Sequence, residues 1–242
     1  MSYEIDWSKV EILSFDCFGT LIDWETGITD AVQLMFDYSS LSASNDEILE
    51  AYARIESELE AESYRPYAEI LRSTMRRLGT DFGYSPDAPT TERLVKSLPR
   101  WPAFDDTVPA LKAMEQKGCK LAAITNCDND LFGETIKNLG VGFDFVVTAE
   151  DARAYKPDVR VFHLARERFN MTDVDLREAG RWVHVAQSRF HDIAPANKLN
   201  LPCVWVDRRH DRDGHGATSP SEAKADLRVE SLSELVEVMG AA

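Results

Sequence analysis

Short apolar runs recur along this chain, and segments with helical periodicity separate most of them. A run that is apolar throughout is typical of a strand buried on both faces, and parallel strands need crossover connections between them. Helical patterns separate the last four runs, so the sequence predicts an α/β fold with a doubly wound parallel sheet. The runs are residues 10–15, 120–125, 145–148, 182–186 and 203–206.

Capping and turn residues locate several connections. Asp128 is suited to cap a helix after the second apolar run. The Lys-Pro-Asp sequence at residues 156–158 predicts the start of another helix, because proline fits the first helical turn. The polar stretch at residues 208–225 predicts a surface loop before a last strand and helix.

About a hundred residues separate the first two apolar runs, which is too long for a loop. The pattern there is helical: a capping Asn45 precedes apolar residues at helical spacing, and further helical stretches follow, the last at residues 91–98. The sequence therefore predicts a core of residues 1–22 and 99–242 with a helical cap inserted at residues 23–98. The apolar residues of the first of these helices are Ile48, Tyr52, Ile55 and Leu59.

The acidic composition argues against two classes of partner. The chain of 242 residues carries a formal net charge of −15, which disfavours binding to nucleic acid or to an anionic membrane. It has no apolar stretch of the roughly 18 residues that a membrane helix needs, and its first residues do not resemble a signal peptide. Its four cysteines form no C-x-x-C pair, so we expect reduced thiols and a cytoplasmic location.

Chemically active residues stand at the carboxyl ends of the predicted strands. Asp16 ends the first strand, Thr125 and Asn126 end the second, Lys156 follows the third, and Asp192 follows the fourth. In an open α/β sheet, this edge is where ligands bind and chemistry occurs. The sequence therefore predicts that these residues share one site.

Each of these residue types has a use in catalysis. A strand-end carboxylate such as Asp16 can attack an electrophilic carbon or phosphorus and form a covalent intermediate. The Lys156 ammonium would hold that carboxylate ionised, and Asp192 would orient the lysine or activate a water molecule. Thr20 can donate a hydrogen bond to the nucleophile, and the Thr-Asn pair of the second strand can donate to a bound oxyanion.

With these residues in place, the sequence resembles the haloacid dehalogenase superfamily. The resemblance covers nearly the whole chain and rests on four segments in order, with a helical insertion after the first. It implies a Rossmann-like core with a helical cap, and Asp16 as covalent nucleophile. The segments are Asp16-Cys17-Phe18-Gly19-Thr20-Leu21, Ile124-Thr125-Asn126, Tyr155-Lys156-Pro157-Asp158 and the stretch at residues 185–193.

Two positions distinguish between the main reactions of this superfamily. Its phosphatase members place a second Asp two residues after the nucleophile and hold Mg²⁺ with acids of the last segment. This chain has Phe18 and Gln187 at those positions. A halide leaving group needs no proton, so the pattern resembles a 2-haloacid dehalogenase of the L-specific type, which implies no metal and no cofactor.

By this resemblance, Asp16 attacks C2 of a small 2-haloalkanoic acid, expels halide with inversion and leaves an ester, which water hydrolyses to a 2-hydroxy acid. Relatives hold the substrate with a cap arginine, for which Arg54 is the candidate here and Arg65 the rival. Relatives also carry Tyr where this chain has Phe162, and Ser-x-Asn where it has residues 187–189. The other predicted substrate-binding residues are Phe18, Thr125, Asn126 and Ser188.

Other interpretations stay open. A phosphomonoesterase with a reduced acid set and a non-catalytic binding protein both fit this fold, and so does a homodimer. Cys17 lies beside the nucleophile, but strand alternation favours a small buried side chain over a reactive thiol. His191 is either a general base or a packed imidazole. Three aromatic residues are candidates for the wall of an apolar pocket: Trp24, Tyr67 and Phe162.

Overall fold

The computed structural model describes residues 3–37 and 41–240, and within them six strands form one parallel sheet. The strand order β3-β2-β1-β4-β5-β6 places β1 near the centre. The strands are β1 (Ile12–Phe15), β2 (Lys120–Thr125), β3 (Phe145–Thr148), β4 (Trp182–Ala186), β5 (Cys203–Val206) and β6 (Leu227–Val229).

The carboxyl end of β1 lies at the point where the strand order reverses. Phe15 is opposite Ala123 of β2 on one side and Val185 of β4 on the other. The chain runs outward from β1 through β2 to β3, and then outward in the other direction from β4 to β6. Such a reversal opens a crevice at the carboxyl ends of the strands, so the residues that follow Phe15 enter the expected ligand site.

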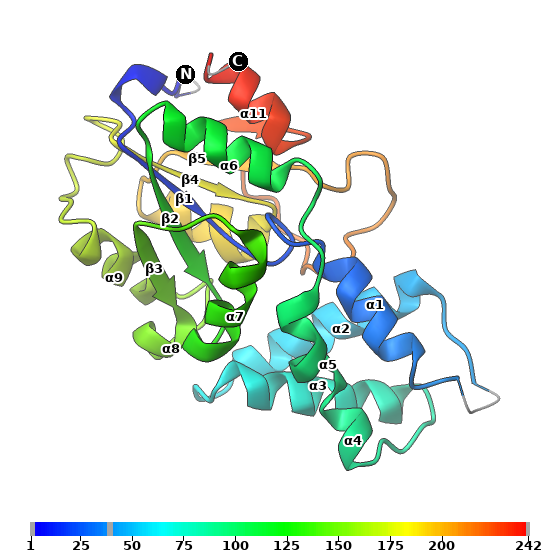
Figure 1. Cartoon of the computed structure of the whole chain (residues 1–242). Coiled ribbons are helices and arrows are strands. Elements are labelled where there is room, and N and C mark those ends of the chain that lie inside the picture. The colour runs from blue at the N-terminus through cyan, green and yellow to red at the C-terminus, as the bar shows by residue number, and fades with distance from the viewer. Residues whose placement is uncertain (1–2, 38–40, 241–242) are drawn as a thin grey trace.

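Side chains of the sheet alternate between two hydrophobic clusters, one on each face. Leu13 belongs to the first cluster and Ile12 to the second. Helices cover both faces (Figure 1), which confirms the predicted α/β doubly wound sheet. The first cluster includes side chains of α6 (Thr107–Gln116), α7 (Asn129–Leu139) and α11 (Leu232–Val238), and the second includes those of α9 (Arg160–Arg168) and α10 (Ala194–Lys198).

The long segment between β1 and β2 is helical, as predicted. Figure 1 shows its helices grouped together on the side of the molecule toward which β1 leads. The hydroxyls of Tyr52 and Tyr67 lie 3.2 Å apart and link two of these helices. The limits of the cap at residues 23 and 98 stay a prediction. The helices are α1 (Trp24–Gln33), α2 (Asn45–Glu60), α3 (Tyr67–Asp81), α4 (Ala88–Thr91) and α5 (Arg93–Ser97).

A core aspartate caps a helix of the insertion. The Pro66 that precedes α3 makes no side-chain capping hydrogen bond. The Asp128 carboxylate instead accepts hydrogen bonds from the backbone N–H groups of Tyr67, at 2.7 Å, and Ala68, at 2.9 Å. The prediction that Asp128 caps the following helix is therefore correct for its backbone position only, because its side chain bonds to α3 instead of α7. This contact fixes the start of α3 against the core.

Two helix predictions need correction, and two helices were not predicted. The helix expected from residue 156 begins at Arg160, because residues 156–159 form a turn, and the Asp158 carboxylate accepts from the Arg160 N–H at 2.9 Å. The helix expected at residues 91–98 is two short helices, α4 and α5, joined at Glu92. The sequence also missed α8 (Ala149–Ala152) and α6. The last strand and helix are present as β6 and α11.

Short single turns complete the fold: η1 (Trp7–Lys9), η2 (Leu98–Arg100) and a π-helical turn, η3 (Arg189–Ile193), which follows β4. All four cysteines are buried free thiols. Across residues 3–37 and 41–240, every helix is too short or too polar to cross a membrane.

Candidate active site

A buried lysine joins the two predicted catalytic carboxylates. The Nζ atom of Lys156 donates to Asp16 Oδ1 at 2.9 Å, to Asp192 Oδ1 at 2.7 Å and to the Ile124 carbonyl at 2.8 Å. An ammonium group has three N–H donors, so these three bonds use all of them. The structure therefore brings Asp16, Lys156 and Asp192 together, as the sequence predicts.

The turn after β1 holds the second oxygen of Asp16. Thr20 Oγ1 donates to Asp16 Oδ2 at 2.7 Å and accepts from the backbone N–H of Gln187 at 2.9 Å. Gly19 has a φ of +97°, a conformation that suits glycine, and a Cβ there would lie 2.9 Å from Trp24 Nε1. From here on, we call four residues the floor of the site: Asp16, Thr20, Lys156 and Asp192.

Arg208 supports this turn, a role that no sequence pattern indicates. Its guanidinium donates to the Thr20 carbonyl, at 2.9 and 3.2 Å, and to Asp106 at 2.9 Å. Arg208 thus connects the polar loop after β5 to Thr20, the residue that bonds Asp16. It acts on Asp16 only through Thr20, which makes it a positioning residue.

A chain of hydrogen bonds through the sheet orients Asp192. The Trp182 indole donates to Ser14 Oγ at 2.7 Å, and Ser14 Oγ lies 2.8 Å from His184 Nδ1. His184 Nε2 lies 2.9 Å from Asp192 Oδ1. Because an indole N–H only donates, the Ser14 hydroxyl is free to donate to His184 Nδ1, and Nε2–H then donates to the carboxylate.

The charges of the floor compensate one another. Burial raises the pKa of Asp16 above its usual value, although the Lys156 ammonium and the Thr20 hydroxyl oppose this rise. Burial acts in the same direction on Asp192, but Lys156 and the His184 hydrogen bond hold its pKa below the usual value. Burial acts to lower the pKa of Lys156, but both carboxylates together raise it above that of a free lysine. The lysine therefore stays charged and favours the ionised form of both carboxylates.

The predicted Thr-Asn pair has two different environments. The Asn126 amide accepts from the backbone N–H of Lys156 at 2.7 Å and donates to the Lys156 carbonyl at 3.1 Å. Its Nδ2 also lies 3.2 and 3.3 Å from the two carboxyl oxygens of Glu60. Thr125 Oγ1 is buried without a hydrogen-bond partner. Asn126 thus connects the core to the cap, whereas Thr125 has a hydroxyl to offer to a ligand.

Ser188 and His191 lie next to the floor. Ser188 Oγ accepts from the His191 backbone N–H at 2.9 Å and lies 3.1 Å from His191 Nδ1. Burial lowers the pKa of His191 to about 4, so its imidazole is neutral near pH 7. His191 Nε2 has no hydrogen-bond partner, and it lies 3.7 Å from Glu60 Oε2.

The cap contributes two buried carboxyl groups that the sequence analysis missed. Glu56 Oε1 accepts from the hydroxyls of Tyr52, at 2.6 Å, and Tyr67, at 2.7 Å. Burial raises the pKa of Glu56 to about 7, and burial with the nearby Glu56 raises that of Glu60 well above its usual value. We call four residues of the cap the roof of the site: Tyr52, Glu56, Glu60 and Tyr67. A signal did exist, since Glu56 and Glu60 extend the helical stripe of Tyr52 at spacings of four residues.

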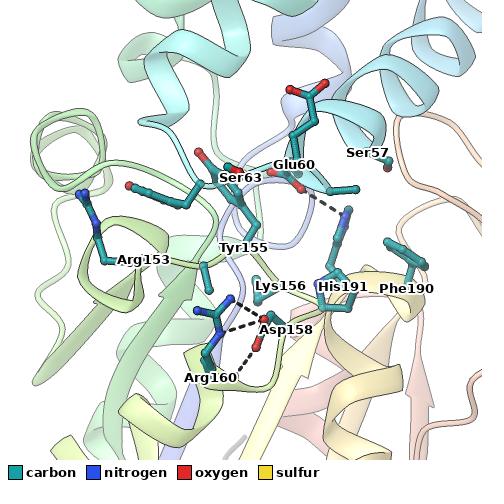
Figure 2. A pocket seen from close by; sticks show the side chains of 15 residues that line it. Ser57, Glu60, Ser63, Arg153, Tyr155, Lys156, Asp158, Arg160, Phe190 and His191 are labelled. Carbon is teal, nitrogen blue, oxygen red and sulfur yellow. Dashed lines mark hydrogen bonds and ion pairs between the residues drawn. The ribbon is translucent and has the colours of Figure 1, made fainter.

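Floor and roof enclose a small cavity of about 30 Å³, the inner cavity. A second cavity of about 470 Å³, the outer cavity, adjoins it, and Glu60, Lys156 and His191 line both. Figure 2 shows the outer cavity, with the Glu60–His191 pair at its inner end. The inner cavity is lined by Asp16, Phe18, Trp24, Glu56, Glu60, Tyr67, Thr125, Asn126, Lys156, Ser188, His191 and Asp192.

Two predicted residues are not brought to the inner cavity. Arg54 lies on the exposed face of α2, with its side chain 54% exposed, and pairs with Asp81 and Glu58. Its rival Arg65 pairs with Glu62. Neither lines the inner cavity within the described part of the chain. The assignment of either arginine to a substrate therefore stays a prediction, and the observed positions do not support it.

Of the aromatic residues predicted to lie at the site, some line the inner cavity and one does not. Phe18, Trp24 and Tyr67 line the inner cavity. Phe18 packs edge-on against Trp101, with ring centroids 5.9 Å apart. Phe162 instead packs against the His184 ring in the second hydrophobic cluster. Cys17 is buried in the first cluster, and burial raises the pKa of its thiol well above the usual value.

Among the residues that the structure describes, no three His, Cys, Asp or Glu side chains form a group that could hold a metal ion. At the position where phosphatases of the superfamily carry an acid, the Gln187 side chain accepts from the Thr218 hydroxyl at 3.0 Å.

Known proteins resemble this chain in sequence and in fold. Haloacetate dehalogenase H-2 of Moraxella sp. (strain B) is 25% identical over 206 residues, which cover 83% of this chain and 87% of the relative. (S)-2-Haloacid dehalogenase of Pseudomonas putida is 24% identical over 174 residues, or 71% of each protein.

The fold is similar to that of L-2-haloacid dehalogenase from Xanthobacter autotrophicus with chloropropionic acid covalently bound. That structure has a TM-score of 0.78 and 17% identity, and the match covers 96% of this chain and 98% of the other. The family model described as haloacid dehalogenase-like hydrolase matches residues 10–181, more than half of the chain. The chain therefore belongs to the haloacid dehalogenase-like hydrolase family.

Proposed function

We propose that this protein hydrolyses the carbon–halogen bond of small 2-haloalkanoic compounds through an ester on Asp16. The observation that carries the proposal is the floor, in which Lys156 and Thr20 each bond one oxygen of the Asp16 carboxylate beside the inner cavity. The 2-haloalkanoic acids predicted from the sequence, which yield 2-hydroxy acids, are the first substrates to assay. The dehalogenase names of the two sequence relatives support this reaction class.

In the first step, an oxygen of Asp16 forms a bond to the halogen-bearing carbon while the carbon–halogen bond breaks. The halide leaves with the bonding electron pair and needs no proton. Phe18, which occupies the position of a proton-donating acid in phosphatases, is compatible with this requirement and packs against Trp101 instead. Lys156 holds the attacking carboxylate in its ionised form.

In the second step, a water oxygen adds to the ester carbonyl carbon of Asp16. The bond between that carbon and the alcohol oxygen then breaks; one proton of the water passes to the alcohol oxygen and the other leaves to solvent, so that the alcohol is released and the carboxylate restored. Asp192 Oδ2 is buried without a hydrogen-bond partner and lies beside the inner cavity, so it is free to accept the proton of this water. The covalently bound chloropropionic acid in the Xanthobacter autotrophicus enzyme supports an intermediate of this kind on the shared fold.

The decisive measurement is halide release from chloroacetate and both enantiomers of 2-chloropropionate, with and without Mg²⁺. We expect release in both conditions and a loss of at least about 10³-fold in kcat for Asp16→Asn, because the attacking group is removed. Asp81→Asn makes the same chemical change on an exposed pair with Arg54 and is the matched control.

A single turnover in H₂¹⁸O tests the ester itself. The label is expected in Asp16 and not in the product alcohol, because water attacks the carboxyl carbon. Label in the alcohol would show direct attack by water. Mg²⁺-dependent release of phosphate from p-nitrophenyl phosphate, without halide release from any haloacid, would replace the proposal with the phosphomonoesterase alternative, and inactivity in both assays would favour a binding protein.

A further inference from the structure

The inner cavity lacks a free cation for a substrate carboxylate. Lys156 is the only lysine or arginine among the described residues that line it. All three of its N–H donors are bonded to Asp16, Asp192 and the Ile124 carbonyl. A bound carboxylate would therefore meet no unused ammonium or guanidinium group there. Arg54, the residue predicted to bind it, lies on the opposite, exposed face of α2.

The cap presents carboxyl groups at this cavity instead. One carboxyl oxygen of Glu56 accepts hydrogen bonds from the hydroxyls of Tyr52 and Tyr67, and the side chain is almost entirely buried. Glu60 has a side chain only 6% exposed, and its hydrogen bonds to Asn126 are long, at 3.2 and 3.3 Å. Glu60 also lines both cavities, so a substrate that enters from the outer cavity passes it.

Unpartnered polar atoms at the same cavity indicate a place for a ligand. Thr125 Oγ1, His191 Nε2 and Asp192 Oδ2 are buried without hydrogen-bond partners, and all three residues line the inner cavity. Buried polar atoms in folded proteins nearly always have a partner, so a set of three at one cavity points to groups supplied by a ligand or water. Asp192 Oδ2 accepts only, whereas Thr125 Oγ1 and a protonated His191 Nε2 can donate, so the complementary ligand offers both donors and acceptors.

On the basis of the proposed carbon–halogen hydrolysis, we infer that Glu60 is a specificity-determining residue that selects a hydrogen-bond donor, such as a primary amide, beside the reacting carbon in place of a carboxylate. An amide N–H₂ group donates to Glu60, and its carbonyl accepts from Thr125 Oγ1 or from His191 Nε2–H. A carboxylate of the same size offers acceptors only and adds a negative charge next to Asp16. Burial raises the pKa of Glu60, and a donor at this position would return its carboxyl to the ionised form.

The test compares an amide with the acid of the same shape. Halide release from 2-chloropropionamide and 2-chloropropionate is measured for the wild type, Glu60→Gln and Glu58→Gln at one pH. Glu58 lies on the exposed face of the same helix and is the matched control. We expect the wild type to prefer the amide in kcat/KM by at least roughly tenfold, because a mismatched polar group leaves buried partners unpaired.

Glu60→Gln offers an N–H₂ donor to the carboxylate, so the amide-to-acid ratio is expected to fall by about tenfold or more, whereas Glu58→Gln keeps the wild-type ratio. A wild type that prefers the acid, or a ratio that Glu60→Gln leaves unchanged, would overturn the inference while halide release still supports the proposed function. If the Glu60 variant does not fold, the wild-type preference between the amide and the acid alone tests the inference.

Binding of unreactive propionamide and propionate to the wild type, measured by calorimetry, separates specificity from reaction. If no halide is released from either substrate, the proposed function fails. Tighter binding of propionamide that Glu60→Gln removes would still support the role of Glu60. Equal binding, tighter propionate binding or no binding of either compound would overturn it.

Discussion

The floor and the roof of the inner cavity both contain buried ionisable groups, but the charge of these groups is compensated in different ways. In the floor, the Lys156 ammonium lies between Asp16 and Asp192 and bonds both. In the roof, Glu56 and Glu60 have hydroxyl and amide partners and no cation of their own. The floor therefore pairs its carboxylates with a cation, whereas the roof presents carboxyl groups whose charge depends on what binds or on pH.

The magnitude of charge repulsion explains why the charges of the floor and of the roof must each be compensated. Two like charges about 4 Å apart repel by roughly 4 kcal/mol at an effective dielectric constant near 20. A cavity of about 30 Å³ cannot hold several uncompensated carboxylates at that cost. The floor offsets its charge with a permanent ammonium, and the roof offsets it by taking up protons, as the raised pKa values of Glu56 and Glu60 indicate. In the proposed reaction, the core residues thus supply the attacking group and the cap residues select the substrate.

Removal of the floor cation is expected to have the largest effect. Lys156→Met leaves two buried carboxylates without their partner, which costs about 3–5 kcal/mol in the free energy of unfolding. We expect halide release to fall at least about 10³-fold as well, because the pKa of Asp16 rises when the ammonium is lost. Urea unfolding and steady-state kinetics measure the two effects separately.

Two further variants control this experiment. Lys137→Met makes the same change at a side chain that is 70% exposed, and we expect its stability to stay within about 0.5 kcal/mol of the wild type. The double variant with Lys156→Met and Asp192→Asn carries one fewer buried charge and is expected to recover part of the lost stability. If Lys156→Met unfolds at the same urea concentration as the wild type, the floor does not depend on charge compensation.

The floor was predictable from the sequence because its residues follow recognisable strands. Asp16, Lys156 and Asp192 each come shortly after an apolar run, and parallel strands bring their carboxyl ends to one edge. What the sequence could not give was the support around them. The His184 link to Asp192 and the Arg208 link to Thr20 join residues far apart in the chain, through side chains that no local pattern distinguishes.

The roof was harder to predict because helical patterns are read from apolar residues. The apolar spacing of Tyr52, Ile55 and Leu59 identifies the buried face of α2, but it does not select Glu56, a charged residue on the same face. Arg54 was selected by chemical type, although two residues along a helix turn the side chain by about 200° away from Tyr52. Helical geometry alone therefore places Arg54 on the exposed face, which the structure shows.

A pH series tests whether protonation removes the negative charge of the roof carboxyl groups. The pKa of Glu56 is raised from 4.5 to about 7 by burial, so its neutral form is favoured in the folded protein. This contribution to stability is fully present below pH 4.5 and is lost as the pH rises through 7. Tyr52 and Tyr67 face this carboxyl with pKa values well above 10, and Glu60 lies nearby with a raised pKa of its own.

Glu56→Gln replaces the titrating group with a neutral one that still accepts from both tyrosines. Relative to this variant, we expect the wild type to lose roughly 2–3 kcal/mol of unfolding free energy between pH 5 and pH 8. Urea unfolding at four pH values in this range measures the difference. Glu58→Gln, on the exposed face, should follow the wild type at every pH. Parallel curves for wild type and Glu56→Gln would mean that the roof carboxyl does not titrate here.

The smallest effect is expected for Arg54→Ala. This variant tests whether an arginine on the exposed face of α2 binds the substrate, as its chemical type suggests, or does not, as its position suggests. If Arg54 bound the substrate, as the sequence predicts, its loss would raise KM by a factor of about 10 to 100, because a charged hydrogen bond is worth roughly 1.5–3 kcal/mol. Its exposed pairs with Asp81 and Glu58 predict instead a change of less than about twofold in kcat/KM and at most about 1 kcal/mol in stability. A large rise in KM would require α2 to present its other face to the inner cavity when substrate binds, and the roof would then describe only the unliganded protein. An unchanged KM leaves Glu56 and Glu60 as the described residues of α2 that line the inner cavity and can meet the substrate.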